Sequence, residues 1–478
     1  MSVLDTIGIL SPEATRLPVL ALGSSAAARD LSAAESGGPY GIVLVAPSAD
    51  EARDRSWLAG AAARVERELD VSGLAYVVGP RRARRAVRAH LEAAQLVTGP
   101  TLLHIPSVEI SANVVPLEKA PARYALDSLL GMRRWKRRAA LPAVRVSPHL
   151  LAPVSPAQGF AARRADAPAP FAWLGDVARA TTAVVTAPTG GAGESVVLHA
   201  FGDGGDPVAV LKLALSPAAT KRLRQEADAL TRLGPTARDA GARVAHGDEL
   251  RDPVDRPVLR QSFVAGRPAA RAIAEAPHLL PAVLERVADW LLAWQRATAA
   301  ARPLARSELQ AMLLDPLALV APRLADAPAY SDWLEALCGD VEGLPLARVA
   351  VHHDLTMANV LLGDGVPIGV VDWEMAREDG LPLVDLVYAI ADAAAARERY
   401  TARPEAFDEM FGAQPATLAT RLVGRQTEDL NLEPRLIRVC FHACWLHHAA
   451  NEARVSPGGG PFLAILERVA RAPSAVAR

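Results

Sequence analysis

Residues 349–362 read VAVHHDLTMANVLL and residues 368–374 read IGVVDWE, and these two stretches decide how the rest of the chain is interpreted. In each stretch an apolar run leads into polar residues, which is typical of buried strands that end in functional loops. The first stretch carries a carboxylate at Asp354 and an amide at Asn359, and the second carries carboxylates at Asp372 and Glu374. The pattern predicts a strand, a catalytic loop, a second strand and a metal-binding loop, against the alternative of a chance polar loop.

These residue types at these spacings suit phosphoryl transfer. Asp354 is a carboxylate that can take the proton of an acceptor hydroxyl, and Asn359 and Asp372 can hold Mg²⁺. Residues 352–359, HHDLTMAN, match the catalytic-loop pattern H-x-D-L-x-x-x-N of kinases, with His353 where protein kinases have Arg. We therefore expect this segment to bind a nucleotide and its metal ion and to act on a hydroxyl group.

The segment resembles the aminoglycoside phosphotransferase and choline kinase family, whose usual form is His-Gly-Asp, then Asn, then a metal site of the form Asp-Trp or Asp-x-Glu. The resemblance implies a bilobal, protein-kinase-like α+β fold over about residues 171–478, with a largely helical second lobe at 266–478. It also implies ATP and Mg²⁺ as cofactors. The acceptor would be a small-molecule hydroxyl compound, such as an aminoglycoside, a sugar, an amino alcohol or a related metabolite.

The resemblance to this family also leads to expectations for four further residues near the motif. We expect His352 to support the loop, and His353 departs from the family glycine, so the backbone must tolerate a side chain there. Glu374 is either a further metal or substrate carboxylate or merely a polar residue after the loop. Residues 380–386, GLPLVDL, match the family pattern Gly-x-Pro-x-x-Asp-Leu, in which Asp385 would begin a helix and hold the catalytic loop.

Residues 171–265 carry the pattern of a nucleotide-binding lobe. A β-branched run at 181–186 and an apolar run at 196–201 flank a glycine loop that could approach phosphates, or could be only a hairpin turn. Lys212 ends an apolar strand and would bind the α- and β-phosphates, and Glu226 on the following helix would hold its ammonium group. Glu226 could instead be an exposed helical partner of Arg222. The glycines concerned are Gly190, Gly191 and Gly193.

Composition narrows the remaining choices. The chain has 478 residues, which predicts two or three domains, and its net charge of −1 disfavours nucleic acid as a partner. Three cysteines form no disulfide framework, so we expect a cytoplasmic protein. No secretory signal is expected at the N-terminus, and no apolar run is long enough to predict a membrane span. The sequence gives no indication of an oligomeric state.

The first 141 residues alternate predicted strands with Ala- and Arg-rich helices, which suggests a small α/β domain with a largely parallel sheet. This part resembles a degenerate class I methyltransferase-type Rossmann domain. Gly23 is its only early glycine after a strand, so we expect no S-adenosylmethionine to bind and predict a docking or stabilising module. The basic runs at 81–88 and 133–138 suit phosphate or a solvated surface, and the Pro-rich range 142–170 is predicted to be a linker.

Two features of the second lobe are ambiguous. The helix containing CFHACWLHH (440–448) places Cys440, Cys444, His447 and His448 on one face, which suggests either zinc or a buried core helix. Acidic residues in the C-terminal part that could hold a cationic amine are no denser than on an ordinary surface, so the acceptor stays open. These residues are Asp379, Glu398, Glu428 and Asp429.

Two other readings of the whole chain compete with the small-molecule kinase. One is a kinase-fold nucleotide sensor or scaffold with weak catalysis, in which the N-terminal domain does the binding. The complete set of Lys, Glu, Asp, Asn and Asp positions disfavours it, because a dead site has no chemical need for them. The other is a protein kinase, which the absence of an Ala-Pro-Glu segment and of a recognisable activation loop after Asp372 disfavours.

Overall fold

The computed structural model of the protein describes residues 1–29, 39–108, 110–129, 140–142, 144, 146–150, 157–187, 195–252, 256–412, 417–456 and 458–474. The chain divides into two units. Unit 1 comprises Met1–Arg224 and Gly247–Phe263, and unit 2 comprises Gln225–His246 and Val264–Arg478. Helix α8 (Pro217–Arg232) contains the division between them. The structure is a mixed α/β protein, as the sequence predicts, with one large sheet in unit 1 and mostly helices in unit 2.

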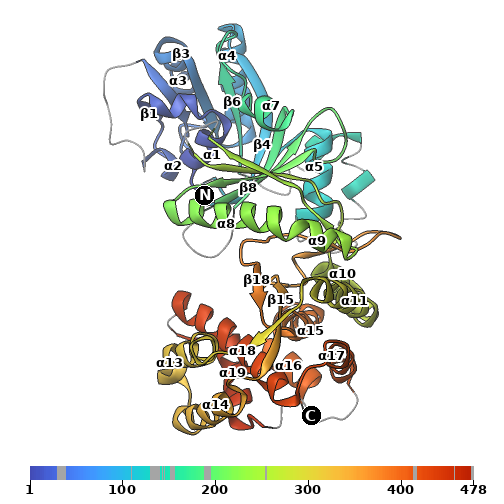
Figure 1. The fold of residues 1–478 in the computed structure, drawn as a ribbon. Helices are drawn as coiled ribbons and strands as arrows, with labels where there is room; N and C mark the ends of the chain where they lie inside the picture. Colours follow the sequence, from blue (N-terminus) through green and yellow to red (C-terminus); the bar gives the residue numbers. More distant parts are fainter. Residues whose placement is uncertain are drawn as a thin grey trace. The chain divides into compact units, whose positions relative to one another are not determined.

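Unit 1 is built on an 11-stranded sheet of order β1-β2-β3-β6-β4-β5-β7-β8-β9-β12-β11 (Figure 1). Strands β1 to β3 pair in parallel, and every other neighbouring pair is antiparallel. The strands are β1 (Val19–Leu22), β2 (Tyr40–Val45), β3 (Leu69–Val78), β4 (Val97–Pro106), β5 (Ser111–Pro116), β6 (Gln158–Arg163), β7 (Thr182–Thr186), β8 (Ser195–Phe201), β9 (Ala209–Ala214), β11 (Gly247–Arg251) and β12 (Val258–Ser262).

The apolar run of β2 is buried on both faces of this sheet, as expected of a strand in a covered parallel sheet. Val43 and Val45 face a core shared with α3 (Arg55–Glu68) and α4 (Arg81–Ala93). Ile42 and Leu44 belong to a second core that includes α1 (Val3–Leu10), α7 (Trp173–Ala178) and residues of β7 to β9. Because one core runs under both the first strands and β7 to β9, the sheet continues without a break. The other helices are α2 (Ala26–Arg29) and α5 (Lys119–Tyr124).

Part of the range predicted to be a linker forms β6. This strand lies between β3 and β4 and is antiparallel to both, so β4 runs in the direction of β1 to β3 but is separated from them in the sheet by β6. The sheet is therefore mixed, where a largely parallel one was expected. The sequence QGFAAR hides the strand because a short strand buried on both faces shows no alternation. The proposed boundaries at 141 and 171 stay a prediction.

The turn after β1 is tightly closed. Gly23 has φ +116°, and a Cβ there would lie 2.3 Å from the carbonyl oxygen of Ala46. The Glu51 carboxylate accepts the N–H groups of Ser24 at 3.0 Å and Ser48 at 2.7 Å. In a Rossmann fold, N–H groups of the turn after the first strand face the phosphates of a dinucleotide. Here the N–H of Ser24 in that turn donates to Glu51. The expectation that no S-adenosylmethionine binds here stays a prediction.

The first basic run lies on α4, and two of its arginines make contacts within the fold. Arg84 is buried and donates to the carbonyl oxygen of Gly79 at 2.9 Å and to Gln158. Arg88 donates to Thr98 and lies 4.2 Å from the ring centroid of Phe160. These two side chains therefore hold α4 to the sheet. The second run, 133–138, lies outside the described residues.

Unit 2 consists of helices around two small sheets, β10-β17-β16-β13 and β14-β15-β18. Its strands are β10 (Arg243–Val244), β13 (Arg267–Pro268), β14 (Ala300–Pro303), β15 (Pro345–Val351), β16 (Val360–Leu362), β17 (Gly369–Val370) and β18 (Arg377–Gly380). Its helices are α9 (Gly234–Asp239), α10 (Ala269–Glu275), α11 (Leu280–Thr298), α12 (Arg306–Leu309), the π-helical turn η5 (Gln310–Leu314), α13 (Asp315–Val320), α14 (Ala327–Val341), α15 (Val384–Arg397), α16 (Arg403–Phe411), α17 (Leu418–Asp429), α18 (Pro434–Val455) and α19 (Pro461–Arg471).

Helix α15 is the centre of unit 2, because all its residues from Val384 to Ala396 are buried. Leu386, Ile390 and most of its alanines pack in a core with Trp294 of α11 and Trp373, and its other side joins the core of α18. A helix that is buried all round can carry acidic side chains only where they have partners. Among the described residues, no helix is both long enough and apolar enough to cross a membrane.

Candidate active site

The predicted catalytic loop connects β15 to β16 and closes on itself through its carboxylate and its amide. The side-chain Nδ2 of Asn359 donates to the backbone oxygen of Asp354 at 2.9 Å and to its Oδ2 at 3.2 Å. Burial raises the pKa of Asp354 to about 7, and the carboxylates of Asp372, Asp392 and Glu374 add to the rise, while the Asn359 hydrogen bond opposes it. Asp354 is thus a stronger base than an ordinary aspartate.

Asp385, at the start of α15, binds the backbone of this loop. Its Oδ2 accepts the backbone N–H of His352 at 2.7 Å, and its Oδ1 accepts that of His353 at 2.8 Å. Burial raises the pKa of Asp385 to about 6, although both hydrogen bonds lower it. His353 has φ +63°, the left-handed conformation that glycine adopts most easily, so the two bonds hold a strained turn in place.

Close strand packing explains why the motif at 380–386 begins with a glycine. Gly380 pairs with Val349 across β15 and β18, and a Cβ on it would lie 2.2 Å from Cγ2 of Val351. Any larger residue would push β18 away from the strand that leads into the catalytic loop. The motif therefore brings Asp385 under the loop by letting its own strand lie close to β15.

The second polar loop lies beside the first because of the strand pairing. Val360 of β16 pairs with Val370 of β17, and the N–H of Val371 donates to the oxygen of Asn359 at 3.1 Å. Asp372 follows directly, so the hairpin brings Asn359 and Asp372 to the same end of two paired strands. Asp372 has φ +70°, again left-handed. The assignment of these two residues as metal ligands stays a prediction.

His352 connects the two loops through its ring. Its backbone N–H is held by Asp385, its Nε2 lies 3.1 Å from the oxygen of Val371, and its ring meets that of Trp373 edge-on at 5.2 Å between centroids. The side chain is fully buried. These contacts tie the two loops together, and the supporting role expected of His352 stays a prediction.

The donor set fits a Mg²⁺ ion. Asn359 donates through Nδ2 to Asp354, and its Oδ1 accepts no hydrogen bond from any described residue. Asp372 and Glu374 are half-buried carboxylates that already raise the pKa of Asp354 by repulsion, so this side of the loop gathers negative charge. Amide and carboxylate oxygens are the ligands that Mg²⁺ prefers. A cation bound there would relieve the repulsion.

Asp392 belongs to the site, although sequence reasoning missed it. It is fully buried on α15 and accepts the N–H of Met357 in the catalytic loop at 2.7 Å. It also accepts from Tyr400 at 3.1 Å and from Arg403 at 3.0 Å. The available signal was its spacing from Asp385: seven residues are two helical turns, so both acids lie on one face of an otherwise apolar helix.

The residues of the predicted nucleotide lobe fall in different parts of the structure. Lys212 lies within β9 of unit 1, where it pairs with Val197 and Leu259 in the sheet register. Glu226 lies in the part of α8 that belongs to unit 2, where it is fully buried and accepts the N–H of Trp373 at 3.3 Å. It is therefore not an exposed helical residue. The glycines Gly190, Gly191 and Gly193 lie outside the described residues.

A cavity of about 480 Å³ lies in unit 2 beside the catalytic loop. His353 and Asp385 form the wall next to the loop, and Tyr388 of α15 and His448 of α18 stack there with ring centroids 3.7 Å apart. Of the four acidic residues considered for a cationic acceptor, only Asp379 lines it. A hydroxyl compound in this cavity would lie next to the loop that carries Asp354.

Helix α18, considered for zinc, uses its cysteines and histidines in packing. Burial raises the pKa of Cys440 to about 12 and that of Cys444 well above its usual value. His447 receives a hydrogen bond from Asn451 at 2.9 Å, and His448 is stacked on a tyrosine. Within the part of the chain that the structure describes, no three histidine, cysteine or acidic side chains are grouped as metal ligands. The buried-helix alternative accounts for these contacts.

Comparison with known proteins bears on the region that carries these residues. A sequence model described as the phosphotransferase enzyme family matches residues 184–425, half of the chain. A search of curated proteins found no match. Among solved structures, macrolide 2'-phosphotransferase MphH from Brachybacterium faecium is 21% identical, with 58% of this chain and 86% of that chain covered and a TM-score of 0.34.

Two aminoglycoside phosphotransferase structures have comparable sequence identities and TM-scores. Aminoglycoside phosphotransferase APH(3'')-Id from Streptomyces rimosus is 18% identical, with 54% of this chain and 90% of that chain covered and a TM-score of 0.35. A thermostable mutant of APH(4)-Ia in a ternary complex with AMP-PNP and hygromycin B is 18% identical, with 61% and 94% covered and a TM-score of 0.41. The family match includes the catalytic loop, the metal loop and the start of α15. The chain belongs to the phosphotransferase enzyme family.

Proposed function

We propose that the protein transfers the γ-phosphoryl group of ATP to a hydroxyl group of a small molecule, with Mg²⁺ as the metal ion. The observation that carries the proposal is the closed loop of Asp354 and Asn359, held by Asp385 and placed beside Asp372. It supplies a base with a raised pKa and, next to it, an amide oxygen and a carboxylate suited to Mg²⁺.

Each residue has a defined task in this mechanism. Asp354, in its ionised form, accepts the acceptor's hydroxyl proton as the hydroxyl oxygen forms a bond to the γ-phosphorus. The bond from the γ-phosphorus to the β,γ-bridging oxygen breaks, and ADP leaves. Asn359 and Asp372 would hold the Mg²⁺ ion, which would stabilise charge on the phosphates when bound. We assign phosphate binding to Lys212 and its support to Glu226, by resemblance to the family.

The proposal can be tested with a panel of hydroxyl compounds. Purified protein is given MgATP and each compound in turn, and ADP formation is followed by a coupled assay. Asp354→Asn serves as the blank, because it keeps the shape of the side chain and removes the base. Asp364→Asn is the matched control, since Asp364 is exposed in the turn of the β16–β17 hairpin.

The expected result is acceptor-stimulated ADP formation that Asp354→Asn loses and Asp364→Asn keeps. If Asp354→Asn retained the stimulated rate, the assignment of the base would be wrong. If MgATP bound to the wild type and no compound stimulated its use, the nucleotide-sensor alternative would be favoured over the enzyme.

A further inference from the structure

The charges around the cavity in unit 2 bear on what kind of acceptor it takes. The cavity wall carries two arginines, Arg348 and Arg377, and three acids, Glu308, Asp379 and Asp385. Two positive and three negative side chains give the wall a formal charge of −1. What matters for a ligand is which of them still have hydrogen-bonding capacity after their contacts within the protein are counted.

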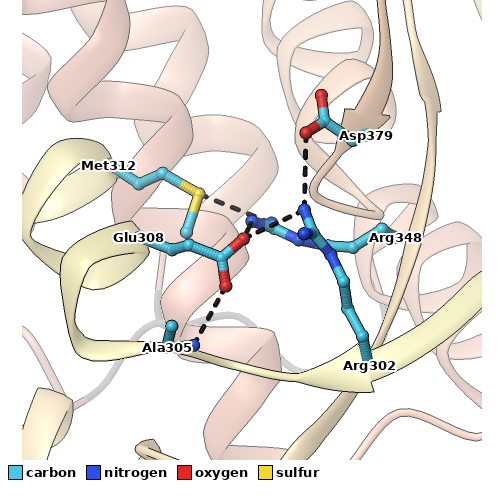
Figure 2. Close-up of polar contacts among 6 residues, drawn as sticks. All are labelled: Arg302, Ala305, Glu308, Met312, Arg348 and Asp379. Atoms are coloured by element: carbon cyan, nitrogen blue, oxygen red, sulfur yellow. Dashed lines mark hydrogen bonds and ion pairs between the residues drawn. The ribbon is translucent and has the colours of Figure 1, made fainter.

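The acids of the wall are already bound to partners. Asp385 accepts two backbone N–H groups of the catalytic loop. Glu308 accepts the N–H of Ala305 at 2.9 Å with one oxygen, and its other oxygen meets Arg348 at 2.6 Å and Arg302 at 3.0 Å. Figure 2 shows one oxygen of Glu308 facing both guanidinium groups.

Asp379 is the most exposed acid of the wall, and it too faces an arginine. Its carboxylate lies 3.4 Å from Arg302, which is the guanidinium group between Glu308 and Asp379 in Figure 2. A cationic ligand that approached Asp379 would therefore meet Arg302 as well. Glu308 and Asp379 thus face arginines, and Asp385 is bound to the backbone of the loop that carries Asp354.

The arginines, in contrast, keep unused donors. The side chain of Arg348 is only 6% exposed, and its Nε has no acceptor among the described residues. Its Nη1 meets only the sulfur of Met312 at 3.5 Å, and sulfur is a weak acceptor. Arg377 is exposed at the edge of the cavity, and no described residue forms an ion pair or hydrogen bond with its guanidinium group. A buried donor without an acceptor is costly unless a ligand supplies one.

The histidines of the wall do not add positive charge. Burial lowers the pKa of His353 to about 3 and that of His447 to about 4, and the charge of Arg377 contributes to both. Arg377 therefore lies close enough to the catalytic-loop histidine to affect its charge. The imidazoles are neutral at pH 7, so the two guanidinium groups are the available charged donors at this end of the cavity.

We infer that the acceptor carries an anionic group, a carboxylate or a phosphate, in addition to the hydroxyl that receives the phosphoryl group. The guanidinium groups of Arg377 and Arg348, two residues that line the cavity, would bind this group, because guanidinium N–H groups match the oxygens of both anions. The inference rests on the proposed function, since it takes the cavity next to His353 of the predicted catalytic loop as the acceptor site. It deepens that function by naming the charge class of the substrate.

Two matched sets of compounds test the inference. Glucose, glucosamine, glucuronate and glucose 6-phosphate share a ring, and glycerol, serinol, glycerate and glycerol 3-phosphate share a short chain; each set holds a neutral, a cationic, a carboxylate and a phosphate member. Binding to the full-length protein is measured by calorimetry at pH 7.5, and ADP formation is measured in parallel. The carboxylate and phosphate members show which anion is preferred.

We expect at least one anion to bind saturably and about tenfold tighter than its neutral and cationic counterparts. Arg377→Gln should weaken binding of that anion roughly 5- to 10-fold, as loss of a charged hydrogen bond does, and leave the neutral compound unchanged. Arg471→Gln, an exposed arginine at the end of α19 outside the cavity, is the matched control. Arg348→Gln should also weaken the anion, and its melting temperature shows whether unit 2 stays folded.

The outcomes separate this inference from the proposed function. Equal or tighter binding of glucosamine or serinol, or no saturable binding of any anion at tens of millimolar, overturns the inference. If ADP formation is fastest with a cationic member, the proposed function is supported and the inference is wrong. If anions bind selectively and no ADP forms, the charge preference stands and the proposed function fails.

Discussion

Asp392→Asn tests whether the buried acid that the sequence did not reveal supports the catalytic loop. Asp392 accepts from Met357, Tyr400 and Arg403, and the Arg403 side chain is only 14% exposed. Removing one partner of a buried ion pair costs about 3–5 kcal/mol, because the other charge stays desolvated. Arg403 also lies 4.8 Å from the ring centroid of Phe462, which retains part of its stabilisation. We therefore expect a loss of about 3 kcal/mol in the free energy of unfolding.

The measurement is urea denaturation followed by tryptophan fluorescence, which monitors the buried Trp373 and Trp445 of unit 2. A cycle with Arg403→Gln should give a coupling free energy of about 1–3 kcal/mol, because the residues are in contact. Asp228→Asn is the control: Asp228 pairs with Arg232 on the surface, so its loss should cost less than about 1 kcal/mol. Additive effects in the cycle, or an Asp392→Asn protein as stable as the control, would refute this role.

Four further predictions concern the site and its surroundings. Asp354→Ala should abolish phosphoryl transfer and leave MgATP affinity within a few-fold, since the base meets the acceptor; unchanged turnover would contradict this. Asp372→Ala should weaken MgATP binding measured by calorimetry, and equal affinity would remove it from the metal site. Lys212→Met should raise KM for ATP and lower kcat. In a double-mutant cycle with Glu226→Gln, the effects on kcat/KM should be non-additive if the two side chains act together. Burial lowers the pKa of His442 from 6.5 to about 4. The unfolded chain therefore binds a proton at this residue more readily, and the free energy of unfolding falls by roughly 3 kcal/mol as the pH drops from 6.5 toward 4. His442→Gln should lose less stability over this pH range when unfolding is measured by urea titration.

Local sequence determined the two polar loops around Asp354 and Asp372. The order of apolar run, His352, Asp354, Asn359, apolar run and Asp372 is contained within 24 residues, and a two-stranded hairpin suffices to bring its polar ends together. Motif and periodicity depend only on neighbours along the chain, so they can be read without a structure. The same holds for the motif that ends in Asp385, where the glycine is needed for close strand pairing.

Tertiary structure decided the features that depend on distant segments. Strand β6 has no periodic signal, and its place between β3 and β4 follows from burial on both faces by residues far away in the chain. The role of Asp392 required the fold of α15 under the loop, because a single carboxylate in an alanine-rich helix does not indicate its partners. The pairing of the charged side chains around the cavity was also hidden. Glu308 is paired with Arg302 and Arg348, which lie on two different strands. Charge can be counted along a chain, but its pairing is a property of three-dimensional contacts.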